Sequence, residues 1–165
     1  MNTEKAKDYC TTYCRKMFEK NIPDEAAVML SILLQAEEES LISRNWRKEI
    51  DVTVLVSFIE NNSVKLEEEW QAEYKRLKQI LDYGGKMEYE EMTIILSRRS
   101  NLESNLRFVA QKPTKMLPDL DEGLQEVLKL NREYARDSRN SNRKHTGGLE
   151  TYLSNHWWWR YDEEN

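Results

Sequence analysis

The residues best suited to chemistry in this sequence are two cysteines and two histidines, and their positions limit what they can do. Cys10 and Cys14 are four residues apart, so on a helix they share one face, one turn apart. This spacing is not the C-x-x-C redox motif, and His145 and His156 are remote from it in sequence. We therefore expect two reduced cysteines that fill core space, no metal site and no cofactor.

Paired glutamates are the next groups that could do chemistry. Carboxylates on two neighbouring helices hold Mg²⁺ against a phosphate chain in the all-α nucleotide pyrophosphohydrolases, in which a third Glu follows a Glu pair by one turn. The pairs Glu38-Glu39 and Glu68-Glu69 lack that third carboxylate. Adjacent carboxylates also point in different directions around a helix and cannot all face one metal. We interpret these clusters as solvated helix faces.

Residues 139–145 read Arg-Asn-Ser-Asn-Arg-Lys-His and are similar to the R-x(4–6)-H signature of the HEPN-family ribonucleases, which are small all-α domains. The resemblance rests on Arg139 and His145. It implies a metal-independent cleavage of RNA, in which His145 exchanges a proton with the ribose 2′-hydroxyl or the leaving oxygen and Arg139 steadies the phosphate. A ribonuclease is therefore one hypothesis, and it predicts that His145→Ala abolishes cleavage.

The same basic segment supports a second hypothesis without catalysis. Residues 136–148 contain Arg, Lys, Asn, Ser and Gly but no core residue, which predicts a mobile basic loop. A nucleic-acid-binding adaptor would use residues 136–144 to contact phosphates, with nearby aromatic rings stacking on bases. The basic residues concerned are Arg136, Arg139, Arg143 and Lys144. The formal net charge of −5 argues against general nucleic-acid binding, because such binding depends on a cationic surface.

Three consecutive tryptophans form the most unusual feature of the sequence. Trp157, Trp158 and Trp159 must point in different directions on a helix or a strand, so one compact core does not easily enclose all three. Tryptophan and tyrosine dominate interface hot spots, which favours a partner-binding site made of these residues and Tyr161. The alternative is that the aromatic segment 149–161 folds back and seals the chain's own bundle, with the indole N–H groups reaching water.

Composition predicts the elements that must position these residues. The 165 residues are 33% charged and include only 5 Gly and 3 Pro, which favours charge-coated helices. Leu66, Trp70, Tyr74, Leu77 and Leu81 recur at spacings of three and four and predict a helix that begins at Ser63 and ends before Gly84-Gly85. The other expected helices cover residues 3–20, 24–43, 92–109 and 119–134, with a linker bracketed by Pro113 and Pro118.

The segment 46–60 is ambiguous between helix and strand. Residues 50–58 alternate apolar and polar side chains, as a strand does, but Leu55 and Ile59 break the alternation and no comparable second strand lies nearby. We therefore expect a buried helix, with one short strand pair involving residues 50–58 as the alternative. The predicted fold class is an all-α, irregular bundle of five to seven helices that forms a single domain over residues 1–165.

This pattern favours a non-catalytic protein-interaction module, a regulator or inhibitor that acts by binding another macromolecule. Small acidic helical proteins of this kind are common among phage and mobile-element regulators. We expect the partner to be another protein or a second copy, with RNA or DNA as the alternative. The first residues do not resemble a signal peptide, and no run approaches the roughly 18 to 20 apolar residues that cross a bilayer. The sequence therefore predicts a cytoplasmic protein without membrane contact.

Overall fold

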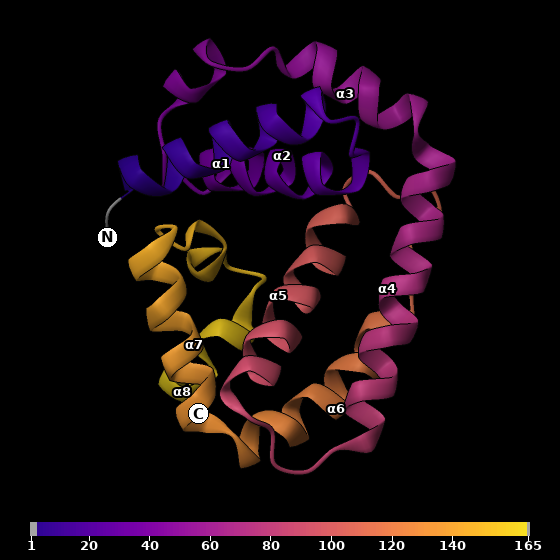
Figure 1. The fold of residues 1–165 in the computed structure, drawn as a ribbon, viewed down its shortest axis with the longest axis vertical. Coiled ribbons are helices and arrows are strands. Elements are labelled where there is room, and N and C mark those ends of the chain that lie inside the picture. Colours follow the sequence, from indigo (N-terminus) through magenta and orange to yellow (C-terminus); the bar gives the residue numbers. More distant parts are fainter. Residues whose placement is uncertain (1–2, 165) are drawn as a thin grey trace.

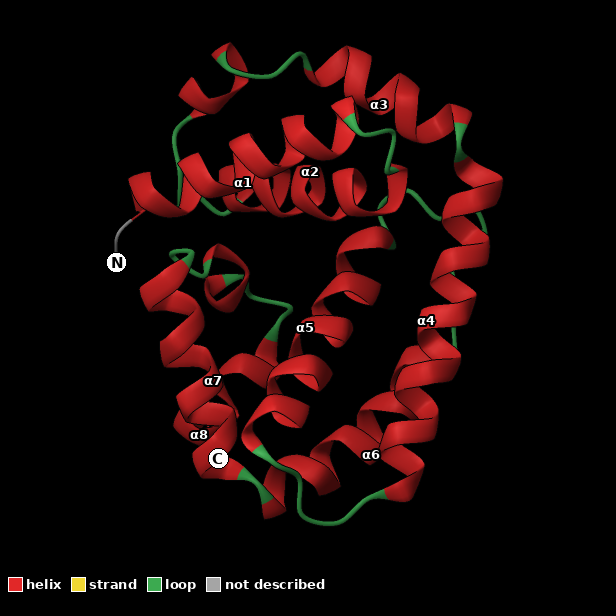
Figure 2. Cartoon of the chain, viewed as in Figure 1, coloured by secondary structure: helices red, strands yellow, loops and turns green. Residues whose placement is uncertain are grey.

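The computed structural model describes residues 3–164, and this part of the chain is entirely helical apart from its loops (Figures 1 and 2). It holds eight α-helices, slightly more than the five to seven predicted, and three short 3₁₀ segments. The excess comes from a helix in the segment expected to be a loop and from a four-residue helix that follows the tryptophans. No helix among the described residues is both long enough and apolar enough to span a membrane.

Helices α1 (Thr3–Glu19) and α2 (Pro23–Glu38) form a hairpin and lie side by side (Figure 1). Asn21 adopts a left-handed conformation with φ 61° between them, which amide side chains tolerate better than most. Pro23 begins α2, a position where a missing backbone N–H costs nothing. The predicted start is therefore correct to within one residue, but α2 ends at Glu38, five residues before the predicted end at Ser43.

The ambiguous segment forms a 3₁₀ turn, η1 (Arg44–Lys48), followed by helix α3 (Val52–Asn61). The side chain of Asp51 caps α3 by accepting a hydrogen bond from the Val54 N–H at 3.2 Å. The strand alternative is thus wrong. The helix is also less buried than expected, since Leu55 and Ile59 are its only buried residues and Val54 is exposed.

Helices α4 (Ser63–Tyr83), α5 (Tyr89–Asn105) and α6 (Met116–Leu130) follow. In α4 the predicted stripe is the buried face, with Trp70 and Leu77 almost inaccessible to solvent. The Trp70 indole N–H donates to the Leu102 carbonyl at 2.9 Å and so joins α4 to α5. The predicted start of the next helix at residue 119 is three residues late, because α6 already begins at Met116 and accommodates Pro118 in its first turn.

The remaining elements are α7 (Arg132–His145), η2 (Leu149–Tyr152), η3 (Trp157–Arg160) and α8 (Tyr161–Glu164). The core consists of two hydrophobic clusters, one mainly between α1, α2 and α3 and the other between α4, α5, α6 and α7. Residues 149–161 take part in both, since Leu149 and Leu153 lie in the first cluster and Trp158, Trp159 and Tyr161 in the second. The aromatic segment therefore joins the two halves of the molecule (Figure 1).

Candidate functional site

The segment predicted to be a mobile loop at 136–148 is helix α7 up to His145, and only its last three residues lie outside a helix. Four arginines of α7 occur at spacings of four, three and four and so share one face. They are Arg132, Arg136, Arg139 and Arg143. Three of them pack on or pair with the C-terminal segment. The buried face of α7 is therefore made of arginine side chains covered by aromatic rings, and it lacks the apolar stripe by which a helix is predicted from sequence.

The structure does not bring Arg139 and His145 together as a catalytic pair. Arg139 is 6% exposed, and its guanidinium forms ion pairs with Asp162 and Glu163. His145 is exposed at the last position of α7. Six helical residues correspond to a rotation of roughly 240° and a rise of about 9 Å, so the two side chains lie on different faces.

The other residues of the nucleic-acid hypothesis divide in the same way. Arg143 lies over the Tyr152 ring at 4.0 Å and donates to the Thr151 hydroxyl at 2.8 Å. Arg136 and Lys144 are exposed, and Arg136 lies 3.5 Å from Asp137. Two of the four predicted cations are therefore engaged in structure, and α7 does not present all four of them to solvent.

The three tryptophans do point in different directions, and two of those directions lead into the protein. Trp158 and Trp159 are 0% and 1% exposed, whereas Trp157 is half-buried. Tyr161 is buried as well. Two of the three rings are enclosed because η3 lies between α5 and α7, with core on more than one side. Of the four predicted partner-binding residues, only Trp157 offers exposed ring surface.

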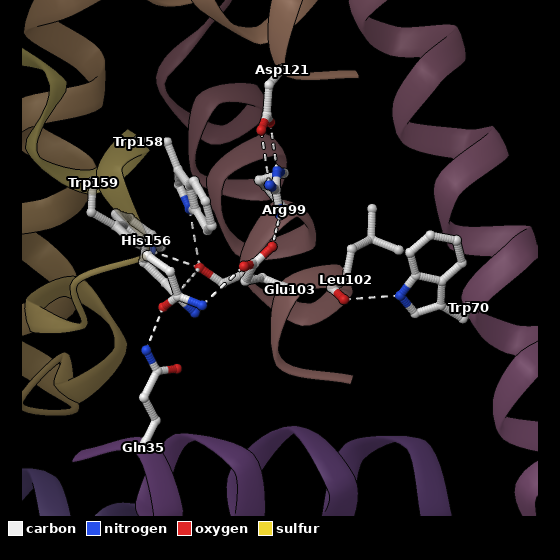
Figure 3. Close-up of polar contacts among 11 residues, drawn as sticks. Gln35, Trp70, Arg99, Leu102, Glu103, Asp121, His156, Trp158 and Trp159 are labelled. Carbon is white, nitrogen blue, oxygen red and sulfur yellow. Dashed lines mark hydrogen bonds and ion pairs between the residues drawn. The ribbon is translucent and has the colours of Figure 1, made fainter. Parts of the chain in front are cut away.

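Trp158 and Trp159 meet at a single hydroxyl group on α5 (Figure 3). Ser100 Oγ lies 3.1 Å from the Trp158 indole nitrogen, 2.7 Å from that of Trp159 and 3.1 Å from His156 Nδ1. A hydroxyl accepts two hydrogen bonds and donates one, and an indole N–H can only donate. Ser100 therefore accepts from both indoles and donates to His156 Nδ1, which assigns the ring proton of the neutral histidine to Nε2.

His156 is fully buried, and its charge state follows from that environment. Burial, together with the positive charges of Arg99 and Arg160, lowers the pKa of His156 to about 3. Its Nε2 makes no hydrogen bond to any described residue. Ser100 is 3% exposed and both of its lone pairs are used by indoles. Ser100 and His156 are residue types that can act as nucleophile and base, but here they are buried and join α5 to the aromatic segment.

Arg99 supplies the charge beside this junction (Figure 3). It is 3% exposed and donates to both carboxylate oxygens of Asp121 at 2.7 and 3.0 Å and to Glu103 at 3.0 Å. Its guanidinium also lies over the Trp158 ring at 4.2 Å. Burial lowers the pKa of Arg99, but the hydrogen bonds and charges of the two carboxylates outweigh it and raise the pKa overall. Arg99 therefore stays charged and locks α5, α6 and η3 together.

We expect the His156 ring to remain neutral when the pH is lowered from about 8 to about 5, since its pKa lies near 3. An unfolded chain protonates the same ring near pH 6.5, so below that pH it takes up a proton that the folded chain does not. His156 thus lowers the free energy of unfolding progressively as the pH falls from 6.5 toward 3. Histidine ring NMR signals followed against pH test this, and a His156 midpoint near 6.5 would contradict it.

The cysteines lie in the core between α1 and α2, unpaired and buried. Burial raises the pKa of the Cys14 thiol to about 12 and raises the pKa of Cys10 as well. Both thiols are therefore poor nucleophiles at neutral pH. Within residues 3–164, no group of three or more His, Cys, Asp or Glu side chains is arranged to hold a metal ion.

The exposed apolar surface gathers around the connection 84–88, which sequence analysis did not single out. Seven large hydrophobic side chains are exposed among the described residues, and Tyr83, Ile94, Leu130 and Tyr134 belong to the elements that meet at this connection. Tyr83, at the end of α4, is 95% exposed. We call the area formed by Ile80, Tyr83, Lys86, Met87, Ile94, Leu130 and Tyr134 the turn surface.

Two adjoining hollows shape the turn surface. One, of about 600 Å³, lies between α4 and α5 and is lined by Ile80, Tyr83 and Met87. Glu91 and Arg98 line it from α5, and Ile94 falls between them on the same helical face. The other, of about 370 Å³, lies at the junction of α6 and α7 and is lined by Leu130 and Tyr134. Lys86 and Met87 line both hollows, so the two lie side by side.

A buried asparagine holds the connection 84–88 in place. Asn131 Oδ1 accepts from the Met87 N–H at 2.8 Å, and Asn131 Nδ2 donates to the carbonyls of Gly85 at 3.2 Å and Val127 at 2.7 Å. Asn131 is 5% exposed, so these bonds are shielded from competing water. The turn surface is therefore built on a fixed backbone.

Comparisons with protein-family models, with curated proteins and with solved structures find no match to this chain.

Proposed function

We propose that this protein is a non-catalytic binding protein that contacts another protein through the turn surface. The observation that carries the proposal is the gathering of Tyr83, Ile94, Leu130 and Tyr134 around one rigid connection. Exposed apolar area of this kind is stabilised by burial against a partner, and tyrosine is among the residues that contribute most at interfaces. A regulator or inhibitor acts in this way, by occupying a surface of its target.

The arrangement of the polar groups supports binding over catalysis. The Ser100–His156 pair is buried beneath the tryptophans, and Arg139 is held in ion pairs away from His145. An enzyme site needs its reacting groups to face a space that a substrate can enter. The side chains that do face solvent in the two hollows include apolar, aromatic and cationic groups suited to contact.

Affinity capture from the native host tests the proposal with a matched pair of variants. Tyr83→Ala and Leu130→Ala together remove exposed apolar area at the turn surface, whereas Val64→Ala removes an exposed apolar side chain, 71% accessible, near the start of α4. We expect the wild type and Val64→Ala to retain the same partner, and the double variant to retain at least about tenfold less. Equal retention by all three baits would contradict the proposal, provided that circular dichroism shows equal folding.

A further inference from the structure

Building on the proposed function, we infer that the partner presents an acidic segment bearing large apolar side chains to the turn surface. The two hollows are lined by five cationic side chains, Arg76, Lys86, Arg98, Lys129 and Arg132, and by only two carboxylates, Glu91 and Glu133. This balance is opposite in sign to the chain as a whole, whose formal net charge is −5. An excess of cations among the lining side chains, beside exposed apolar groups, favours a partner that is acidic and apolar at once.

The chain's own carboxylates compensate the cations on the α4–α5 side only in part. Arg76 and Arg98 share a single carboxylate, Glu73, and each lies 3.4 Å from it. Arg98 Nη1 is the atom that faces Glu73 Oε1, and it is shielded from solvent. Glu91, the one acidic residue that lines this hollow, accepts the backbone N–H of Glu88 at 2.8 Å and is thereby committed to capping α5. One carboxylate beside two guanidinium groups leaves a net positive charge here, which favours an acidic partner.

Lys86 is the cation best placed to contact a carboxylate of the partner. It lines both hollows, is exposed, and makes no ion pair with any described residue. It sits between Tyr83 and Met87 on the connection that Asn131 holds, so the backbone that carries it is already fixed before binding. A partner can therefore contact the Lys86 ammonium group and the apolar side chains of the turn surface at the same time.

The same features favour a protein segment over a nucleic acid. Exposed tyrosines beside cations can stack on bases, but a phosphate backbone carries a charge at every nucleotide. Asp82, Glu88 and Glu90 are exposed and neighbour Tyr83, Met87 and Tyr89 in sequence, so a continuous polyanion meets repulsion around the cations. A peptide with a few carboxylates can place them on the cations alone. The aliphatic members, Ile80, Ile94 and Leu130, also pack on apolar side chains better than on sugar and phosphate.

A phage-displayed library of random short peptides, selected on the full-length protein, tests the inference. We expect the enriched peptides to carry net negative charge and at least one large apolar residue. Their affinity should fall at least about tenfold on Lys86→Glu combined with Arg76→Glu. It should also fall several-fold when NaCl is raised from about 0.05 to about 0.5 M. The matched control, Lys20→Glu combined with Lys65→Glu, reverses two exposed charges away from the turn surface and should leave the affinity unchanged.

The outcomes separate this inference from the proposed function. The acidic partner is overturned if the enriched peptides show no acidic bias or bind both charge-reversal proteins equally. If those peptides lose binding to the protein that carries Tyr83→Ala and Leu130→Ala, the turn surface is still supported as the binding site. Three other results also overturn the acidic partner. The first is that no peptide is enriched, and the second is that single-stranded RNA or DNA binds saturably at the turn surface. The third is that light scattering detects a dimer that Lys86→Glu dissociates. Light scattering and circular dichroism on each variant exclude misfolding as the cause.

Discussion

Trp158→Ala is expected to lower the free energy of unfolding by about 3 to 5 kcal/mol, the cost typical of removing a fully buried aromatic ring. The ring is completely inaccessible, donates to Ser100 at 3.1 Å and lies under the Arg99 guanidinium at 4.2 Å. Its removal leaves a large cavity and deprives a buried cation of one of its contacts. Urea unfolding followed by far-ultraviolet circular dichroism measures the change.

The neighbouring residue gives a control of identical chemistry. Trp157 is half-buried and packs against Trp158 and Tyr161, so Trp157→Ala should cost about 1 kcal/mol. Equal losses at the two positions would show that residue 158 is not the ring enclosed by the core. A loss under about 1 kcal/mol at Trp158 would argue against the junction around Ser100 altogether.

Gly147→Ala is expected to cost roughly 2 to 5 kcal/mol, because it combines a left-handed backbone with an overpacked contact. Gly147 has φ 82°, and a Cβ at this position would lie 2.6 Å from Ala6 Cα and 2.7 Å from Ala6 N. These are backbone atoms of α1, so relief requires the whole helix to shift. The melting temperature should fall accordingly.

Gly85→Ala separates the two causes. Gly85 has the same φ of 82°, but no heavy atom lies within 4 Å of its ideal Cβ. We expect it to lose only about 1 to 2 kcal/mol, the cost of the left-handed conformation. Similar losses for the two variants would mean that α1 does not pack on the backbone of residue 147.

Much of the helical framework could be predicted from the sequence because its apolar spacing is regular. The stripe from Leu66 to Leu81 gave the position of α4 to within a residue, and Trp70 and Leu77 are core as predicted. The segment 50–58 was harder, since its alternating valines suit a strand and a helix equally. Only the Asp51 cap and the absence of a pairing strand in the described chain decide between them.

Helix α7 could not be predicted because its buried face is not apolar. Arg139 and Arg143 are stabilised by Asp162 and by the Tyr152 ring, which are distant in sequence. No local pattern states that a guanidinium will be covered by an aromatic ring from elsewhere in the chain. The choice between a partner-binding and a bundle-sealing aromatic segment could not be made from the sequence for the same reason, since the hydroxyl that accepts both indoles belongs to α5.

The candidate site was also hidden from sequence analysis. Tyr83, Leu130 and Tyr134 come from three different helices, so their proximity depends on where α4 and α6 end and where α7 begins. The only local signal was Gly84-Gly85, which marks the end of α4 and the turn that follows. That signal predicts a turn but says nothing of the exposed side chains around it.

The sharing of residues 149–161 between both hydrophobic clusters has a consequence for how the protein is made. During synthesis α1 and α2 leave the ribosome first, yet Leu149 and Leu153, which complete their cluster, are added more than a hundred residues later. The hydrogen bond from Gln35 to Asn155 spans 120 residues. Contacts so distant in sequence form slowly, because a long loop must close before they contribute. A nascent chain of this protein should therefore stay vulnerable to proteases and dependent on chaperones until residue 161 has emerged, and then fold both halves together.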